Sequence, residues 1–312
     1  MDSPGQDNAS IKTTDVDTSS STQVANAASP VLYVGDVQDR AIRRLKSAGL
    51  ESYRLEADLI VAHVTGVDRV TLFAHPEIPI EADAIEKIES MLNRRITGYP
   101  LAYLLGQWEF YGLQIDVTEG VLIPRDDTET LIEMAVELLY GHDCLVADLG
   151  CGSGCISIAI ATAIPELHIN AYDLSAIAID TTQQNINKHN LTDRIHVSKQ
   201  DMMTVLENQP DSYQAILSNP PYIESAEIDG LQTEISQYEP REALDGGPDG
   251  LKYYPSIFTG AYTALKSGGF VAVEVGAGQA PRVVEMAESS GLRDVRCVTD
   301  LAGIDRVVVG FK

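Results

Sequence analysis

The stretch ADLGCGSGCISIAIATAI, residues 147–164, joins a short apolar strand to an apolar helix through a glycine turn. Gly150, Gly152 and Gly154 stand at alternate positions in that turn. Glycine lets the backbone turn sharply and approach a ligand closely, and the first turn of a helix offers unpaired N–H groups. The stretch therefore predicts a strand–turn–helix unit that binds a ligand at its turn.

Further apolar runs follow this unit, and a helical segment separates each run from the next. Strands that alternate with helices indicate a parallel sheet that is covered on both faces. The final residues 294–312 instead predict two strands with a short loop, an antiparallel hairpin at the sheet edge. The fold class is therefore α/β, with a Rossmann-like, mostly parallel sheet of seven strands. The five strands before the hairpin are CLVADLG (144–150), HINAYDL (168–174), RIHVSKQD (194–201), YQAILSNPPY (213–222) and GFVAVEVG (269–276).

The chain before the sheet has a helical pattern. Residues 36–106 predict a small bundle, because successive segments begin at capping residues and end at glycines. We expect one face of the segment at residues 52–66 to pack inside this bundle, with its histidine as a packed residue rather than a ligand. The residues at helical spacing on that face are Leu55, Leu59, Ala62 and His63.

The remaining segments complete the domain organisation. Residues 1–35 are rich in Ser, Thr and Asp and predict a disordered, acidic tail. Residues 107–124 predict a β-hairpin connector, with period-two alternation around Tyr111-Gly112. Residues 125–312 predict the ligand-binding α/β domain.

The composition limits the classes of function. The net charge is −24, with 22 Lys and Arg against 46 Asp and Glu, which argues against an enzyme that grips duplex DNA. No apolar run is long enough for a membrane span and no signal peptide is visible, so no membrane association is expected. The four cysteines form no CxxC pair, which indicates structural cysteines in a reducing, cytoplasmic compartment and no metal site.

Acidic residues follow the strands at the expected ligand edge. Asp148 precedes the glycine turn, where a carboxylate would repel a pyrophosphate but complement a sulfonium ion. Asp173 follows the second strand and can accept hydrogen bonds from ribose hydroxyls, while Asp201 and Met202 suit an adenine amino group and ring face. S-adenosylmethionine satisfies these features better than a dinucleotide, whose usual motif is GxGxxG rather than GxGxG.

The motif ILSNPPYIES, residues 216–225, places two prolines at the end of the fourth strand. Prolines stiffen the turn and remove N–H groups, so the Asn219 Oδ1 and the Pro220 carbonyl can both accept from one planar NH₂ group. Tyr222 can pack its ring against that group. Two acceptors raise the electron density on an amide or aryl amine nitrogen, which predicts amino-methyl transfer with Asn219, Pro220 and Tyr222 as catalytic residues. This chemistry alone permits adenine, cytosine or glutamine as acceptor.

The chain closely resembles the PrmC/HemK family of protein-(glutamine-N5) methyltransferases, which modify the glutamine of the GGQ motif in peptide chain release factors. The resemblance covers roughly residues 38–312. The stretches that carry it are EADLIVAHVTG (56–66), PLAYLLGQWEFYG (100–112), VLIPRDDTETLIE (121–133), DLGCGSGCISIAIA (148–161), SNPPYI (218–223), YEPREALDGGPDGL (238–251) and DLAGIDRVVVG (300–310).

The resemblance implies a class I sheet that uses S-adenosyl-L-methionine, a helical bundle that recognises substrate, and release factors as partners. The cofactor-binding residues expected from it and from the acidic pattern are Gly150, Cys151, Gly152, Ser153, Gly154, Asp173, Asp201, Met202 and Asn219. The expected substrate-binding residues are Asn219, Pro220, Pro221 and Tyr222. The acidic segment 224–247 is expected to be a lid, a docking rim or a solvated cover.

One position departs from the pattern of the resembled family. Asp126 stands after Arg125 where the family usually has proline, and we expect altered loop stiffness without loss of activity. Asp126, Asp127 or Thr128 is expected to cap the helix that follows. Two other functions remain open at this stage: an amino-methyltransferase of DNA or RNA that acts on adenine N6, and a non-catalytic scaffold that binds the methyl donor.

Overall fold

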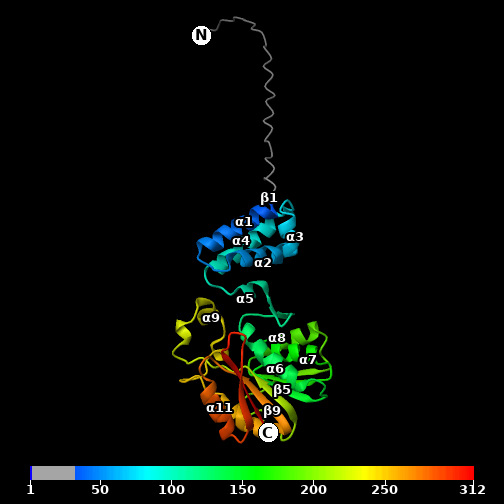
Figure 1. The fold of residues 1–312 in the computed structure, drawn as a ribbon. Helices are drawn as coiled ribbons and strands as arrows, with labels where there is room; N and C mark the ends of the chain where they lie inside the picture. The colour runs from blue at the N-terminus through cyan, green and yellow to red at the C-terminus, as the bar shows by residue number, and fades with distance from the viewer. Residues whose placement is uncertain (2–31) are drawn as a thin grey trace.

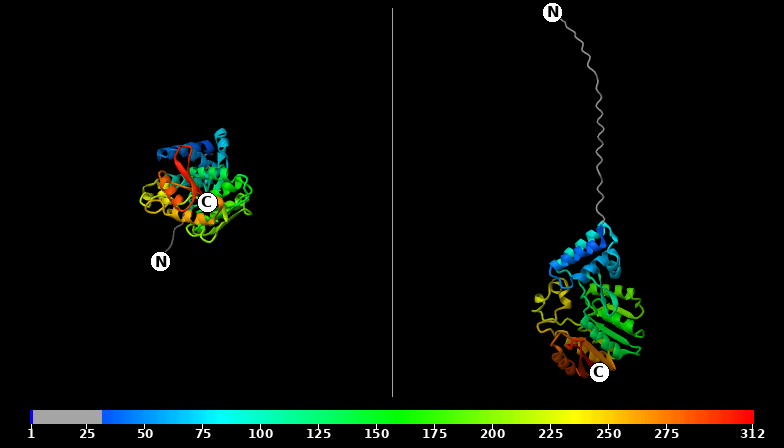
Figure 2. Two further views of the ribbon diagram at one scale, coloured as in Figure 1. Left: turned by 60° about the horizontal axis from the view of Figure 1, so that its bottom comes forward. Right: turned by 45° about the horizontal axis from the view of Figure 1, so that its top comes forward.

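The computed structural model describes Met1 and residues 32–312 of the chain. The predicted tail, residues 1–35, therefore falls almost entirely outside the described residues. In the described part, a helical bundle lies at one end of the molecule and the C-terminus at the other (Figures 1 and 2). None of the helices in residues 32–312 combines the length and the apolar character that a membrane crossing needs.

The bundle is built from amphipathic helices that bury one face each. Its helices are α1 (Val34–Ser47), α2 (Tyr53–Thr65), α3 (Arg69–Ala74), α4 (Ala82–Ile96) and α5 (Leu101–Leu105), with the short pair β1 (Leu32–Tyr33) and β2 (Pro79–Ile80) beside them. Val37, Ala41 and Leu45 recur every four residues along α1 and are buried. This spacing puts them on one side of the helix.

The predicted inner face of α2 is correct at two positions and wrong at two: Leu59 and Ala62 pack against the buried core of the bundle. Leu55 and His63 are exposed, and the buried residues are Glu56, Ala57, Ile60 and Val61. The face is shifted toward Glu56, whose carboxylate pairs with the Arg95 guanidinium of α4; the Arg95 Nε donates to Glu56 Oε2 at 2.6 Å. A buried ion pair between residues far apart in sequence leaves no periodic signal.

A hairpin connects the bundle to the sheet. Strands β3 (Gln107–Phe110) and β4 (Leu113–Asp116) pair in antiparallel fashion. Tyr111 and Gly112 both have positive φ, 52° and 72°, which is the backbone of the two-residue turns that match the strand twist. The hairpin predicted at this position is present.

The main sheet has seven strands in the order β10-β11-β9-β8-β5-β6-β7. The contacts among β5, β6, β7, β8 and β9 are parallel, and β11 pairs antiparallel with both β9 and β10. This confirms the predicted fold class, including the antiparallel C-terminal hairpin. The strands are β5 (Leu145–Leu149), β6 (His168–Asp173), β7 (Ile195–Lys199), β8 (Tyr213–Ser218), β9 (Leu265–Glu274), β10 (Arg293–Thr299) and β11 (Asp305–Phe311).

Helices cover both faces of the sheet (Figure 1). Successive strand residues point to opposite faces, so Val146 packs with α6 and α7 while its neighbour Ala147 packs with α10 and α11. The helices of the sheet domain are α6 (Glu129–Leu139), α7 (Cys155–Ala163), α8 (Ala176–Lys188), α9 (Thr233–Tyr238), α10 (Tyr254–Ala264) and α11 (Ala280–Ser289), with the 3₁₀ turns η1 (Asp126–Thr128), η2 (Ile228–Gly230) and η3 (Arg241–Ala243).

Candidate active site

The glycine loop between β5 and α7 has a left-handed backbone. Gly150, Gly152 and Gly154 have φ of 72°, 57° and 81°, a region that side chains other than glycine rarely adopt. A Cβ at Gly150 would lie 2.6 Å from the Met202 Cε, and one at Gly154 would lie 2.8 Å from the Thr182 Cγ2. The loop therefore requires glycine both for its conformation and for the side chains packed on it.

Asp173 ties the glycine loop to the neighbouring strand. Its Oδ2 accepts from the Gly152 N–H and its Oδ1 from the Ser175 N–H, both at 2.9 Å. Each carboxylate oxygen has a second lone pair available, so the group can still accept from ligand hydroxyls. Asp201, after β7, is held in a similar way by the Met203 N–H.

A cavity of about 580 Å³ lies over this loop, and we call it the loop cavity. Its lining includes every cofactor-binding residue predicted from the sequence except Gly154, which lies just behind it in the loop. The charged side chains among its described lining residues are Arg125, Asp173, Asp201 and Glu242. With three carboxylates and one guanidinium, the cavity suits a cationic ligand with hydroxyl groups better than a pyrophosphate.

Asp148 does not face this cavity as the sequence suggested. It is fully buried beneath the loop, where its Oδ2 accepts from the Ser157 Oγ at 2.5 Å. Its Oδ1 has no hydrogen-bond partner among the described residues. Burial raises the pKa of Asp148 to about 7, because a charged carboxylate is poorly solvated there. The strand carries Asp148 into the packed interior rather than to the surface that the ligand would touch.

Asn219 begins the proline turn that follows β8, the strand next to β5. Its Nδ2 donates to the Thr128 Oγ1 at 3.0 Å. The Thr128 hydroxyl was a candidate helix cap, but no cap hydrogen bond is present at that helix start; it donates instead to the Glu274 Oε2 at 2.6 Å. The other oxygen of Glu274 accepts from the Tyr222 hydroxyl at 3.2 Å. The turn is thus connected to a buried carboxylate by two of its side chains.

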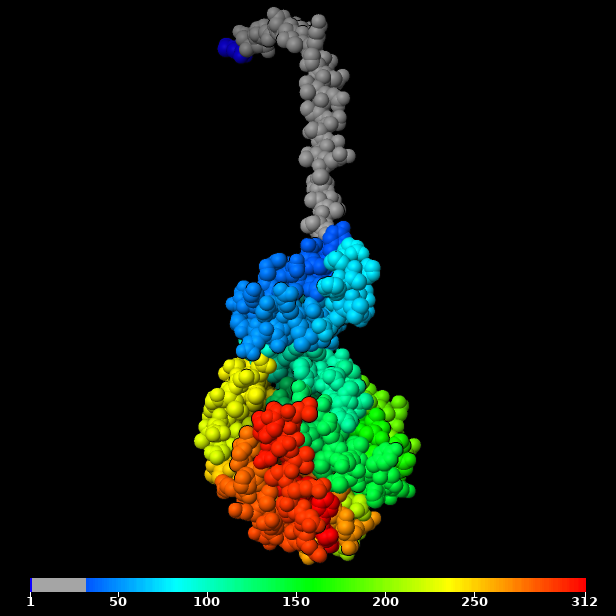
Figure 3. All heavy atoms as spheres, in the orientation of Figure 1, coloured from blue at the N-terminus to red at the C-terminus, as the bar shows by residue number. Residues whose placement is uncertain are grey.

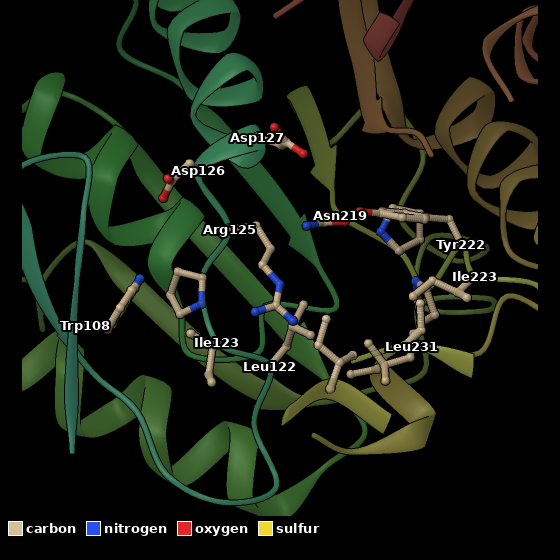
Figure 4. Close-up of a pocket in the computed structure, with 16 residues that line it drawn as sticks. Trp108, Leu122, Ile123, Arg125, Asp126, Asp127, Asn219, Tyr222, Ile223 and Leu231 are labelled. Carbon is tan, nitrogen blue, oxygen red and sulfur yellow. The ribbon is translucent and has the colours of Figure 1, made fainter. Parts of the chain in front are cut away.

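A second cavity, of about 480 Å³, opens on the other side of the turn, and we call it the turn cavity. Figure 4 shows Asn219, Arg125, Tyr222 and Leu231 around this space. Pro220 and Pro221 also line it, so all four predicted substrate-binding residues meet here. The residues that line both cavities are Leu122, Pro124, Arg125, Asn219, Pro221 and Ala243. Asn219 therefore lies where the two cavities adjoin.

The acidic segment 224–247, which we call the rim segment, supplies a wall to both cavities. Leu231 and Ile235 line the turn cavity, and Pro240 and Glu242 line the loop cavity. Figure 3 shows this segment, in yellow, lying below the bundle. Its position argues against a cover that is merely solvated.

Ion pairs anchor the rim segment at two points. Arg95 of α4 donates to Glu234 at 2.7 Å while it also pairs with Glu56 inside the bundle. Arg125 pairs with Glu239, whose other oxygen accepts from the Ile123 N–H at 3.2 Å. The bundle, the connector and the rim segment are therefore joined through buried or half-buried charges.

Comparisons with known proteins identify the family. The family described as PrmC N-terminal domain matches residues 36–106, and the one described as Methyltransferase small domain matches residues 127–239. A Clostridium botulinum protein named release factor glutamine methyltransferase is 38% identical over 269 residues, covering 86% of this chain and 95% of the relative. The chain belongs to the release factor glutamine methyltransferase family. A relative of the same name from Geobacter sulfurreducens is 39% identical over 266 residues, 85% of this chain and 92% of the relative.

Solved structures include another protein of this description. A protein-(glutamine-N5) methyltransferase (release factor-specific) from Alicyclobacillus acidocaldarius is 32% identical, with a TM-score of 0.39, over 61% of this chain and 94% of that one. The hMettl16 catalytic domain in complex with the MAT2A 3'UTR hairpin 6 has a TM-score of 0.53 at 16% identity, over 74% and 82% of the two chains. The latter shows a shared fold alone, that of the class I methyltransferases.

Sequence reasoning missed two side chains of the site in this member of the release factor glutamine methyltransferase family. Glu274 was not singled out within the predicted strand at residues 269–276, and Thr128 was considered only as a helix cap. Both are buried, at 0% and 2% exposure, and a carboxylate is rarely buried without partners. An acidic residue inside the apolar run GFVAVEVG was the signal that could have found Glu274.

Proposed function

We propose that this protein transfers a methyl group from S-adenosyl-L-methionine to the side-chain amide nitrogen of a glutamine, the one in the GGQ motif of peptide chain release factors. The observation that carries this proposal is the position of Asn219, which lines two adjoining cavities. The loop cavity has carboxylates and apolar surface that suit a cationic nucleoside, and the turn cavity has room for an amide side chain. A transfer between two bound molecules needs such an arrangement.

The residues of the loop cavity fit the methyl donor. Asp173 and Asp201 offer carboxylate oxygens to hydroxyl and amino groups, and Met202 and Ile177 offer apolar surface to a ring. The cavity volume of about 580 Å³ falls within the usual range for small-molecule sites, roughly 300–1,000 Å³. When bound, the donor supplies an electrophilic methyl group on a positively charged sulfur, so that the protein needs no nucleophile of its own.

The proline turn acts on the acceptor. An amide nitrogen is a poor nucleophile because its lone pair is delocalised into the carbonyl. Asn219 Oδ1 and the Pro220 carbonyl accept hydrogen bonds from its two N–H groups, which orients the nitrogen and stabilises the positive charge that develops on it. Tyr222 and Pro221 bound the same space and hold the amide plane. The rim segment, as a wall of both cavities, covers part of the space in which the nitrogen would lie.

A release factor is larger than the turn cavity, so it must also contact the surface around that cavity. The rim segment lines the turn cavity and is joined to the bundle by Arg95, and we assign these two parts to release factor recognition. The net charge of −24 disfavours a nucleic-acid substrate. The two cavities that meet at Asn219 are not needed by a scaffold. The four free cysteines suit a reducing compartment such as the cytoplasm, where translation ends.

A labelling experiment tests the proposal. The protein is incubated with a methyl donor that carries a labelled methyl group, together with a release factor, its GGQ→GGA variant or duplex DNA. Label in the unmodified release factor and not in its GGA variant supports the proposed function. Label in DNA would reassign the enzyme to nucleic acid, and no label in any acceptor would favour the non-catalytic scaffold.

A further inference from the structure

The hydrogen bonds behind the proline turn have a fixed direction. Glu274 is buried, and its two oxygens accept from the Thr128 hydroxyl at 2.6 Å and from the Tyr222 hydroxyl at 3.2 Å. Because a hydroxyl has one hydrogen, Thr128 has none left to donate and can only accept from Asn219. Its partner must therefore be the Nδ2 of Asn219, which lies 3.0 Å away.

This direction determines which way the Asn219 amide faces. When Nδ2 is held by Thr128, the carbonyl oxygen Oδ1 is left for the cavities that Asn219 lines. The opposite amide orientation would put two acceptor oxygens together at Thr128 and an NH₂ group where the acceptor amide needs an oxygen. The orientation is a chemical requirement, because an NH₂ group cannot accept a hydrogen bond from the substrate nitrogen.

We propose that Glu274 is a positioning residue, which through the Thr128 hydroxyl holds the Asn219 amide with its oxygen toward the substrate nitrogen. This inference rests on the proposed function, since it names what prepares that oxygen. Neither residue touches the reacting atoms: Glu274 lines neither cavity, and Thr128 lines only the loop cavity. The same carboxylate also anchors Tyr222, so one buried charge arranges both polar side chains of the turn.

The charge of Glu274 is essential to this arrangement. A protonated Glu274 becomes a donor, which lets the Thr128 hydroxyl turn and donate to Asn219 Oδ1, and the amide then faces the wrong way. The groups that face Glu274 are Thr128, Tyr222, Asp127, Arg306, Tyr254 of α10, whose hydroxyl donates to the Glu274 carbonyl at 3.0 Å, and, more distantly, Cys155. Burial outweighs Arg306 and raises the pKa of Glu274 to about 7, so the switch between the two arrangements falls at a pH that kinetics can reach.

Thr128→Val and Thr128→Ser test the proposal as a pair. Valine keeps the shape of threonine but removes the hydroxyl, whereas serine keeps the hydroxyl. We expect Thr128→Val to lower kcat by about tenfold with KM values within about twofold, the effect of losing one hydrogen bond in the transition state. Thr128→Ser should recover most of the activity, and Thr259→Val, at an exposed position of α10, should leave it unchanged.

The pH profile separates positioning from a general loss of structure. For the unmodified enzyme and Thr128→Ser, we expect kcat to rise as pH increases through about 7, because Glu274 must be ionised. In Thr128→Val and Glu274→Gln the rise should be absent, since one cuts the connection and the other removes the titrating group. Glu288→Gln, on the exposed side of α11, is the matched control and should keep the rise.

A second measurement does not depend on turnover. The side-chain ¹⁵N–¹H signals of Asn219, assigned by their loss in Asn219→Ala, should shift with the same midpoint near pH 7 in the unmodified protein and Thr128→Ser, and should not shift in Thr128→Val. An unchanged kcat or a persistent pH step in Thr128→Val would overturn the positioning role, as would equal losses in both Thr128 variants. Absence of methylation by the unmodified enzyme would instead defeat the proposed function, and the NMR titration would still decide the positioning role.

Discussion

The glycine loop after β5 and the proline turn after β8 lie at the carboxyl ends of neighbouring parallel strands, but they gain their shape in opposite ways. The glycine loop uses backbone freedom, with three glycines at positive φ, and the proline turn uses backbone restriction. The loop offers a ligand its backbone beside the Asp173 carboxylate at the end of β6, whereas the turn offers the Asn219 side-chain amide and the Pro220 carbonyl. Binding a donor and orienting an acceptor are therefore carried by different chemistry on adjacent strands.

A buried carboxylate lies beneath each of them. Asp148 lies under the glycine loop with one oxygen hydrogen-bonded, and Glu274 lies under the proline turn with both oxygens hydrogen-bonded. Burial raises the pKa of each to about 7. Asp148 thus holds one side chain at the start of α7, the Ser157 hydroxyl, while Glu274 sets the direction of the side-chain hydrogen bonds that reach the proline turn.

The largest expected effect comes from the acceptor side. Asn219→Ala should lower kcat by about 10²–10³-fold, the usual loss when one preorganised polar group at a reacting centre is removed. Donor affinity, measured by calorimetry, should change far less, because Asp173, Asp201 and the glycine loop are intact. Asn208→Ala, at an exposed asparagine, is the control. A loss mainly in donor affinity would contradict the division of roles between loop and turn.

Substitutions in the glycine loop should instead lower the stability of the protein and its affinity for the methyl donor. In Gly154→Ala the new Cβ would lie 2.8 Å from the Thr182 Cγ2, at a φ of 81°. We expect a loss of about 2–3 kcal/mol in the free energy of unfolding, from backbone strain and overpacking together. Gly141→Ala, at a φ of 79° with nothing within 4 Å, isolates the strain and should cost about 1–2 kcal/mol. Equal losses in urea unfolding would show that the packing against Thr182 is not important.

Removing the charge of Asp148 and removing that of Glu274 should change the pH dependence of the free energy of unfolding to different extents. A carboxyl whose pKa is raised in the folded protein binds its proton more tightly there, so its contribution is greatest below its unfolded pKa near 4 and is lost as pH rises through about 7. Each group lowers stability at pH 8 by on the order of 3 kcal/mol relative to its protonated state.

Asp148→Asn should remove this loss and keep the Ser157 hydrogen bond, and so raise the free energy of unfolding at pH 8. Glu274→Gln should recover about 1 kcal/mol less than Asp148→Asn does, because the amide has one acceptor oxygen where the carboxylate has two. Urea unfolding at pH 5 and pH 8 measures both effects. A pH dependence that is the same in both variants and the unmodified protein would contradict the interpretation of these two groups.

The smallest expected effect is that of Asp126→Pro. Asp126 is the first residue of η1, and Arg125 before it is extended, with φ −108° and ψ 139°. Proline is well tolerated at a first helical position after an extended residue. We expect a gain of up to about 1 kcal/mol in the free energy of unfolding from the stiffer unfolded chain, with kcat within about twofold. A large loss of activity would show that the Asp126 carboxylate contributes to the turn cavity.

The fold and most of the site could be predicted because their signals are local. The glycine turn, the strand ends and the proline turn each occupy a few consecutive residues, and parallel strands bring their carboxyl ends to one edge. What was missed depends on pairs far apart in sequence. Thr128 and Glu274 are separated by 146 residues. The inner face of α2 was predicted only in part, and the buried Glu56 was missed because its partner Arg95 is 39 residues away.

The wall shared by the two cavities also has a consequence for inhibition. Because Arg125, Asn219 and Pro221 line both spaces, a single molecule that joins a nucleoside to a carboxamide by a short tether could fill both at once. Its second half would bind at the high local concentration that the tether imposes. Such a compound would discriminate this enzyme from methyltransferases that share only the nucleoside site.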